Sequence, residues 1–161
     1  MAHATLQNNG VTFLDNTGTA VAVFDYTGFK VGATNIVPQV STVTMNMGGP
    51  FANVPIQVTF CRVGKEVTVS FPILNQTTTS ANFITSDTTI PANCITQTPQ
   101  SLPFITTSAG VASMGMIMVC SGAAHNTFII YNTLTTNNFA TATAGVGWQP
   151  QSITYSATDL P

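Results

Sequence analysis

Short apolar segments recur along the whole chain, and polar or turn-forming residues separate them. Between residues 9 and 37, apolar residues alternate with small or polar ones, as at Val11 and Phe13 or Phe29 and Val31. Because alternate side chains of a strand face opposite sides of a sheet, this pattern predicts short β-strands. The turns fall at two D-x-T-G segments, Asp15–Gly18 and Asp25–Gly28, since Asp, Asn and Gly tolerate positive φ. Two such hairpins cannot bury a core alone, so this region needs a partner.

The clearest hairpin lies between residues 56 and 74, where IQVTFCR and VTVSFPIL alternate around a turn at Gly64. Further strands are predicted at Met114–Cys120, Thr127–Tyr131, Asn138–Ala142 and Gln151–Ser156. No segment of ten or more residues has helical apolar spacing with caps. The predicted fold class is therefore all-β, with an antiparallel jelly-roll or β-sandwich head.

The breaker Gly48-Gly49-Pro50 divides the chain into two predicted parts. Residues 1–50 are expected to form an N-terminal attachment segment and a short β-repeat stalk, and residues 51–161 a jelly-roll head.

Charge is scarce, because only eight of 161 residues are Asp, Glu, Lys or Arg. A chain with net charge −2 has no basic patch for phosphates, which argues against nucleic-acid binding. An apolar share of 44% with ten Phe argues against a disordered, threonine-rich stalk. No apolar run reaches the roughly 18 residues of a membrane helix, so no membrane insertion is expected, and the first ten residues lack the apolar core of a signal peptide. Weakly charged surfaces tend to associate, which favours an oligomer.

Few residues are available for chemistry, so the chain is not expected to be an enzyme. His125 lies in a predicted turn, and Glu66, Asp87 and Asp159 show no pairing or metal-binding spacing. No catalytic, cofactor-binding or metal-binding residue is therefore predicted. The three cysteines, Cys61, Cys94 and Cys120, match no zinc pattern and are expected to be free thiols in a reducing compartment, with Cys61 and Cys120 buried.

Trp148 is the single tryptophan, and it follows two glycines at positions 145 and 147. The two glycines suggest a bent strand, and the indole is expected in the core or at a subunit interface, where Trp is enriched. Stacking on a sugar is the alternative, so Trp148 is the candidate ligand contact.

The order of motifs in the last two-thirds resembles viral and phage fibre-head domains, small trimeric jelly rolls similar in shape to the C1q and TNF heads. The motifs that carry the resemblance are RVGKEVTVSFP (62–72), the segment 83–92, the proline-rich step 99–104, the segment 110–117, FIIY (128–131), NFATATAGVGW (138–148) and QSITYS (151–156). The D-x-T-G segments resemble the β-structured shafts that precede such heads. Where family members often have Asn-Gly, this chain has Ser108-Ala109-Gly110.

The resemblance implies a homotrimeric spike on the virion surface that binds a host-surface glycan or protein and is fastened to capsid proteins through its N-terminal segment. Phe139 and Tyr155 are the residues suggested for the three-fold contact. Two alternatives remain open: a minor capsid or cement protein without a receptor, and a lectin-like carbohydrate-binding module.

Overall fold

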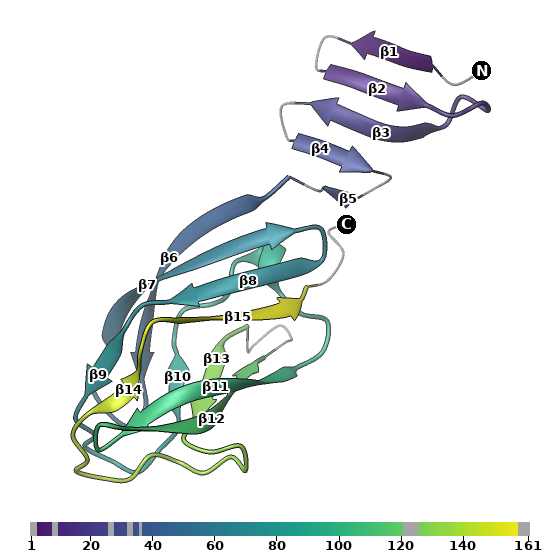
Figure 1. Ribbon diagram of the computed structural model, residues 1–161. Helices are drawn as coiled ribbons and strands as arrows, with labels where there is room; N and C mark the ends of the chain where they lie inside the picture. Colours follow the sequence, from purple (N-terminus) through teal and green to yellow (C-terminus); the bar gives the residue numbers. More distant parts are fainter. Residues whose placement is uncertain are drawn as a thin grey trace.

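The computed structural model describes residues 3–7, 10–25, 28–31, 34–35, 37–120 and 126–157, and nearly all regular structure in them is β. The strands form two sheets, one of five and one of ten strands. Figure 1 shows the five-stranded sheet, here called the stalk sheet, beyond the end of the larger body at which β6 begins. The larger body is here called the head. The predicted all-β, antiparallel fold is confirmed.

The stalk sheet is a meander in which each strand pairs with the next in sequence. A bulge interrupts the pairing of its second and third strands between Phe13 and Leu14. Its strands are β1 (His3–Gln7), β2 (Gly10–Leu14), β3 (Ala20–Asp25), β4 (Gly28–Val31) and β5 (Thr34–Asn35).

The head is one curled sheet with the order β15-β8-β7-β6-β10-β13-β12-β11-β14-β9. A single 3-10 turn, η1 (Ala92–Cys94), interrupts the described strands. The strands are β6 (Gln39–Gly48), β7 (Val54–Val63), β8 (Glu66–Phe71), β9 (Leu74–Gln76), β10 (Ile84–Ser86), β11 (Gln100–Ser108), β12 (Val111–Val119), β13 (Phe128–Tyr131), β14 (Val146–Trp148) and β15 (Gln151–Ser156).

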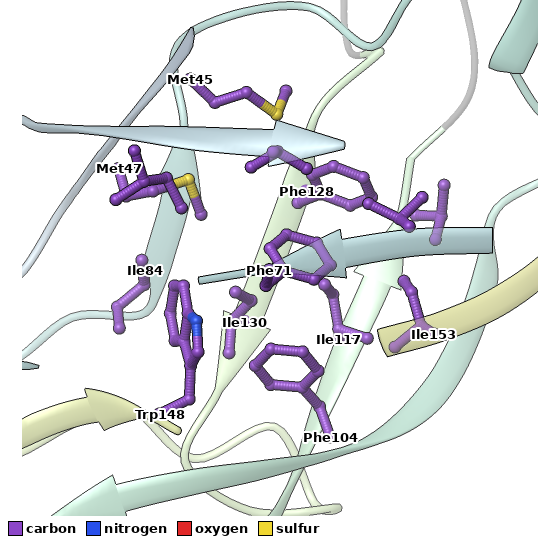
Figure 2. Packing of buried hydrophobic residues seen from close by; sticks show 14 of the residues in the cluster. Met45, Met47, Phe71, Ile84, Phe104, Ile117, Phe128, Ile130, Trp148 and Ile153 are labelled. Carbon is purple, nitrogen blue, oxygen red and sulfur yellow. The ribbon is translucent and has the colours of Figure 1, made fainter. Parts of the chain in front are cut away.

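Curling brings the two halves of the head sheet face to face around an aromatic core. Phe71 of β8 lies edge-on to Phe104 of β11 and Phe128 of β13, with ring centroids 5.4 and 5.1 Å apart. Phe60 of β7 stacks on Phe128 at 6.1 Å. Figure 2 shows Phe71, Phe104 and Phe128 packed with Trp148 among isoleucines from both layers and the two methionines of β6. The head is therefore a β-sandwich in the jelly-roll style.

A sharp corner connects the two layers at Pro72 and Gln149-Pro150. The ribbon of β8 and β15 pairs Phe71 with Gln151, and beyond the corner the ribbon of β9 and β14 pairs Leu74 with Trp148. Trp148 spans the corner, because its indole N–H donates a 2.8 Å hydrogen bond to the Pro72 carbonyl oxygen. The bent strand predicted from the glycines before Trp148 is thus present.

A pair of glutamines closes the seam between the edge strand β15 and β11. The Gln151 amide donates to the Ile105 carbonyl at 2.6 Å and accepts from the Ile105 N–H at 3.0 Å. The Gln100 amide makes the reciprocal pair with the Ser156 carbonyl at 2.6 Å and N–H at 3.3 Å. A side-chain amide has the donor and acceptor of a peptide group, so each glutamine replaces one rung of a β-ladder. The seam shields an edge that would otherwise be open to further pairing.

We expect Gln151→Glu to destabilise the head at neutral pH by about 1–3 kcal/mol, because a carboxylate cannot donate to the Ile105 carbonyl and places a charge against it. Chemical denaturation at pH 7 measures the loss. Gln149→Glu introduces the same charge at an exposed corner residue and should change stability little. Equal losses in the two variants would show that the amide pair contributes nothing.

Two details differ from the sequence-based predictions. β6 pairs with β7 and β10 and belongs to the head, so the change of sheet falls between Asn35 and Gln39 and not after residue 50. The predicted strand Asn138–Ala142 is a loop, in which Phe139 makes an isolated bridge to Asn82. Its apolar signal came from one inward ring and not from a paired strand.

Candidate functional site

One face of the stalk sheet is apolar from strand to strand. The register aligns Val11 with Phe24 and Phe24 with Phe29 in one row across β2, β3 and β4. The rings of Phe24 and Phe29 lie 6.5 Å apart. A second row on the same face joins Ala4, Phe13, Ala22 and Val31, because side chains two residues apart on a strand point to the same side. We call this set the stalk face: Ala4, Val11, Phe13, Ala22, Phe24, Phe29 and Val31.

Nothing in the described chain covers the stalk face. Phe13 is 43% exposed, Phe24 56% and Val31 50%. Among the stalk side chains that the structure describes, none is buried. A sheet with one apolar face needs a second layer to bury it. The sequence predicts that this region needs a partner, and the stalk face is the surface that such a partner would cover.

The β2–β3 turn of the stalk sheet is polar. Asp15 closes this turn, because its carboxylate accepts from the Thr17 N–H at 2.8 Å, the Thr17 hydroxyl at 2.7 Å and the Thr19 N–H at 2.9 Å. The Thr17 hydroxyl first, and then the backbone N–H groups of Thr19 and Thr17, lower the pKa of this carboxyl. The predicted turn at Asp15–Gly18 is confirmed, whereas two residues of the second D-x-T-G turn lie outside the described residues.

The lowered pKa predicts an acid-sensitive turn. The folded state binds the proton of Asp15 less readily than the unfolded chain, so the carboxylate stabilises the turn above the ordinary pKa and loses that effect as pH falls through the folded pKa. We expect the amide signals of Thr17 and Thr19 to shift below about pH 4. Asp15→Asn keeps a side-chain oxygen but cannot titrate, so it should abolish the shift, and an unchanged titration in this variant would contradict the assignment.

The outer faces of the two head layers have opposite character. On β6, β7, β8 and β15, hydroxyl and amide groups pair across strands, as in Thr42 with Thr59 at 3.2 Å and Ser70 with Ser152 at 2.9 Å. Gln57 donates to Thr44 at 2.7 Å in the same manner. We call this surface the hydroxyl face: Thr42, Thr44, Gln57, Thr59, Thr68, Ser70, Ser152 and Thr154.

On β11, β12 and β13 the outward positions are mostly apolar. The register places Met114 opposite Ile105 and Met116 opposite both Pro103 and Tyr131. Ile105 is 49% exposed and Met114 52%. We call this surface the methionine face: Pro103, Ile105, Met114, Met116, Met118, Ile129 and Tyr131. The sequence run MGMIMV indicates such a surface, because it is apolar at both odd and even positions and so predicts a strand that is apolar on both sides.

The end of the head away from the stalk sheet consists of exposed loops. A shallow open depression there is lined by Ala109, Gly110, Ala142, Thr143, Ala144 and Gly145 and has no charged residue. Ala109 (φ 54°) and Gly110 (φ 75°) form the tight turn between β11 and β12, with Ser108 opposite Val111. Positive φ at both central residues is the hairpin geometry for which Asn-Gly is preferred.

The three predicted contact residues lie in the core. Trp148 and Phe139 are fully buried and Tyr155 is 3% exposed. The Tyr155 hydroxyl donates to the Cys94 carbonyl oxygen at 2.8 Å, and burial raises the pKa of this phenol. Side chains enclosed within one chain cannot stack on a sugar or form a three-fold contact. Strand periodicity distinguishes inward from outward positions only relative to a known neighbour, so the sequence could not show that Phe139 and Tyr155 face the core of the head. The core alternative for Trp148 is the one found.

Two of the ionisable groups that the structure describes in the head, Asp87 and Arg62, make hydrogen bonds to neighbouring polar groups. Asp87 accepts hydrogen bonds from Asn46 and Asn53. Arg62, expected at a charged hairpin tip, is 4% exposed and donates to the carbonyls of Gly64 and Asn93. No described group of three His, Cys, Asp or Glu could hold a metal ion. His125 and Asp159 lie outside the described residues.

The cysteines are free thiols among the described residues. Burial raises the pKa of Cys94 to about 11 and also raises that of Cys120, so both are poor nucleophiles. Cys61, expected to be buried, is only half-buried because it points to the outer side of β7.

The molecule thus belongs to a class defined by its architecture: an all-β sandwich head on a single-layered β-stalk. No protein-family model and no curated protein matches the sequence. Among solved structures, the chain is similar to a reovirus attachment protein, sigma1, whose crystal structure was determined in complex with alpha-2,3-sialyllactose. The identity is 10%, the TM-score is 0.43, and the match covers 97% of this chain and 95% of that chain. No helix among the described residues is long and apolar enough to cross a membrane.

Proposed function

We propose that this chain is a virion-surface structural protein, a trimeric spike whose head attaches the particle to a host cell. The N-terminal end would be fastened to capsid proteins, and the loops at the far end of the head would meet a host-surface protein or glycan. The observation that carries the proposal is the uncovered stalk face, because a sheet of this kind requires association.

Three copies of the chain can bury their stalk faces against one another and leave no apolar patch exposed. A head-to-tail arrangement of identical chains closes into a ring, and each sheet then forms one wall around a shared apolar centre. The motif resemblance to fibre heads favours three as the number. The scarcity of charge supports the same reading, since mutual burial removes the risk of nonspecific association that weakly charged surfaces carry.

The head supports an adhesive role better than a chemical one. Its charged residues are few: Arg62 and Asp87 make hydrogen bonds to neighbouring polar groups, and Lys65 and Glu66 are exposed at the β7–β8 hairpin. Its far end offers exposed loop backbone and hydroxyls around the depression at Ala109–Gly110 and Ala142–Gly145. Loops on a rigid β-scaffold are the usual location of recognition.

Sedimentation of the purified chain at micromolar concentration tests the proposal. We expect a trimer that dissociates with Phe13→Asp, because the substitution places a charge within the buried centre. Thr12→Asp is the matched control, since this neighbour faces the opposite side of β2 and should leave the mass unchanged. A monomeric wild-type chain, or equal effects of the two substitutions, would contradict the trimeric stalk.

Location on the particle is tested by immunoelectron microscopy with antibodies raised against the full chain. Decoration of intact particles is the expected result. Reactivity only after particle disruption would favour the minor capsid or cement role instead.

A further inference from the structure

The head carries a second uncovered apolar surface that the stalk does not explain. On the methionine face, seven outward positions of β11, β12 and β13 are apolar, and no charged residue occurs in these three strands. Met116 and Met118 are partly exposed, and Ile105 and Met114 are about half exposed. Contiguous apolar patches of this kind mark interaction sites on soluble proteins.

The hydroxyl face provides an internal comparison. It belongs to the same sandwich, yet most of its outward side chains are hydroxyls and amides, several of which bond to one another. The exposed apolar side chains on this side, Val40 and Val63, lie at its margin and not in a continuous patch. The same chain therefore has one outer layer suited to water and one that is not. The difference indicates that only the methionine face is covered in the working state of the molecule.

We propose that the methionine face is the contact between heads of neighbouring copies of this chain; the inference rests on the proposed oligomeric spike. The occupant is identified first by charge. A surface without charged groups cannot form ion pairs with a charged partner. It can pack against the same surface of another copy, or against another uncharged surface of the same chain, without repulsion or unpaired ions.

Size is the second argument for a copy of the chain. A stable interface needs about 20–30 residues a side, whereas the stalk face and the methionine face each provide seven apolar positions. If one partner covers both faces, the combined surface comes much closer to that requirement. Association through the stalk also holds the heads at an effective concentration in the millimolar range, at which a modest apolar contact forms.

Methionine flexibility suits this location. An unbranched thioether side chain adapts its shape to an irregular opposing surface at little energetic cost. Three of the six methionines in the sequence lie at alternate positions of β12 and on this one face.

Peroxide footprinting of the intact oligomer tests the inference without altering the face. Thr154→Met places a reference methionine on the hydroxyl face, and Met45 and Met47, which are fully buried, report the rate of a core methionine. Oxidation of each site is followed by peptide mass spectrometry. We expect Met114 to oxidise about tenfold more slowly than the reference, the factor produced when the covered state is favoured by about 1.4 kcal/mol.

The outcomes separate the two proposals. A chain that sediments as an oligomer but oxidises Met114 as fast as the reference would overturn the methionine-face contact and leave the proposed spike standing. A reference oxidised as slowly as Met45 would place the copies on the hydroxyl face and also overturn the inference. A monomer with rapidly oxidised Met114 would contradict both. As a further check, Ile105→Lys should raise the Met114 rate in the oligomer, whereas Ser152→Lys, on the hydroxyl face, should not.

Discussion

Trp148→Ala is expected to destabilise the head by about 3–5 kcal/mol, a large share of the roughly 5–15 kcal/mol by which an ordinary domain is stable. The indole is fully buried and contacts two rings, with centroids 6.1 Å from Phe71 and 5.4 Å from Phe104. Its removal leaves a cavity between the layers and an unpaired Pro72 carbonyl at the corner. Denaturant unfolding of the full chain, followed by circular dichroism, measures the loss.

Two further variants show which interaction of Trp148 accounts for the loss of stability. Trp148→Phe keeps an aromatic ring but loses the N–H, and we expect about 2 kcal/mol from the unpaired carbonyl and the smaller ring. Ile73→Ala lies beside the same corner at a side chain that is 53% exposed, and its effect should be small. A folded and fully stable Trp148→Ala protein would show that the corner does not depend on the indole. In that case the burial described for Trp148 would also be in question, and a ligand contact would become testable again.

The all-β class and most strands could be predicted from residue patterns because strand periodicity is local. The hairpin of β7 and β8 and the last strand, Gln151–Ser156, were predicted from alternation and turn residues alone. These features depend on neighbours within a few residues. The prediction of a stalk that needs a partner also followed from local pattern, because short hairpins without a second apolar segment cannot form a core.

Features that depend on distant neighbours could not be predicted. Gln100 and Gln151 are ordinary polar residues in sequence, and only the curl of the sheet brings each to the backbone of the other strand. The inward or outward direction of Phe139, Tyr155 and Trp148 depends likewise on which layer covers them. The candidate interaction sites in the structure are the stalk face and the methionine face, because these apolar surfaces are exposed whereas the three rings are buried.

The two apolar faces and the closed seam suggest how the chain directs association. The Gln100 and Gln151 amides occupy the backbone groups of the β11–β15 seam, so that edge is a poor site for strand addition. The uncovered surfaces are sheet faces, which associate by side-chain packing and can be specific in shape. At this seam, copies should therefore not add edge to edge, and association through the two apolar faces is favoured.

Gly147→Ala should be the most damaging small substitution in the head, with a cost of about 4 kcal/mol or more. A Cβ at this position would lie 2.0 Å from the Leu74 carbonyl oxygen and 2.6 Å from its carbon, and φ is +150°. The obstructing atoms are backbone of the paired strand β9, so relief requires β9 and β14 to separate at the corner. Thermal and denaturant unfolding would both register the loss.

Gly110→Ala is the matched control for this substitution, because it also has positive φ (+75°) but nothing lies within 4 Å of its Cβ. It should cost only the backbone term of about 1–2 kcal/mol. The difference between the two variants therefore isolates the close approach of β14 to β9. Equal costs at the two positions would mean that the strands separate readily, and the corner could not then act as the rigid connection between the two layers of the head.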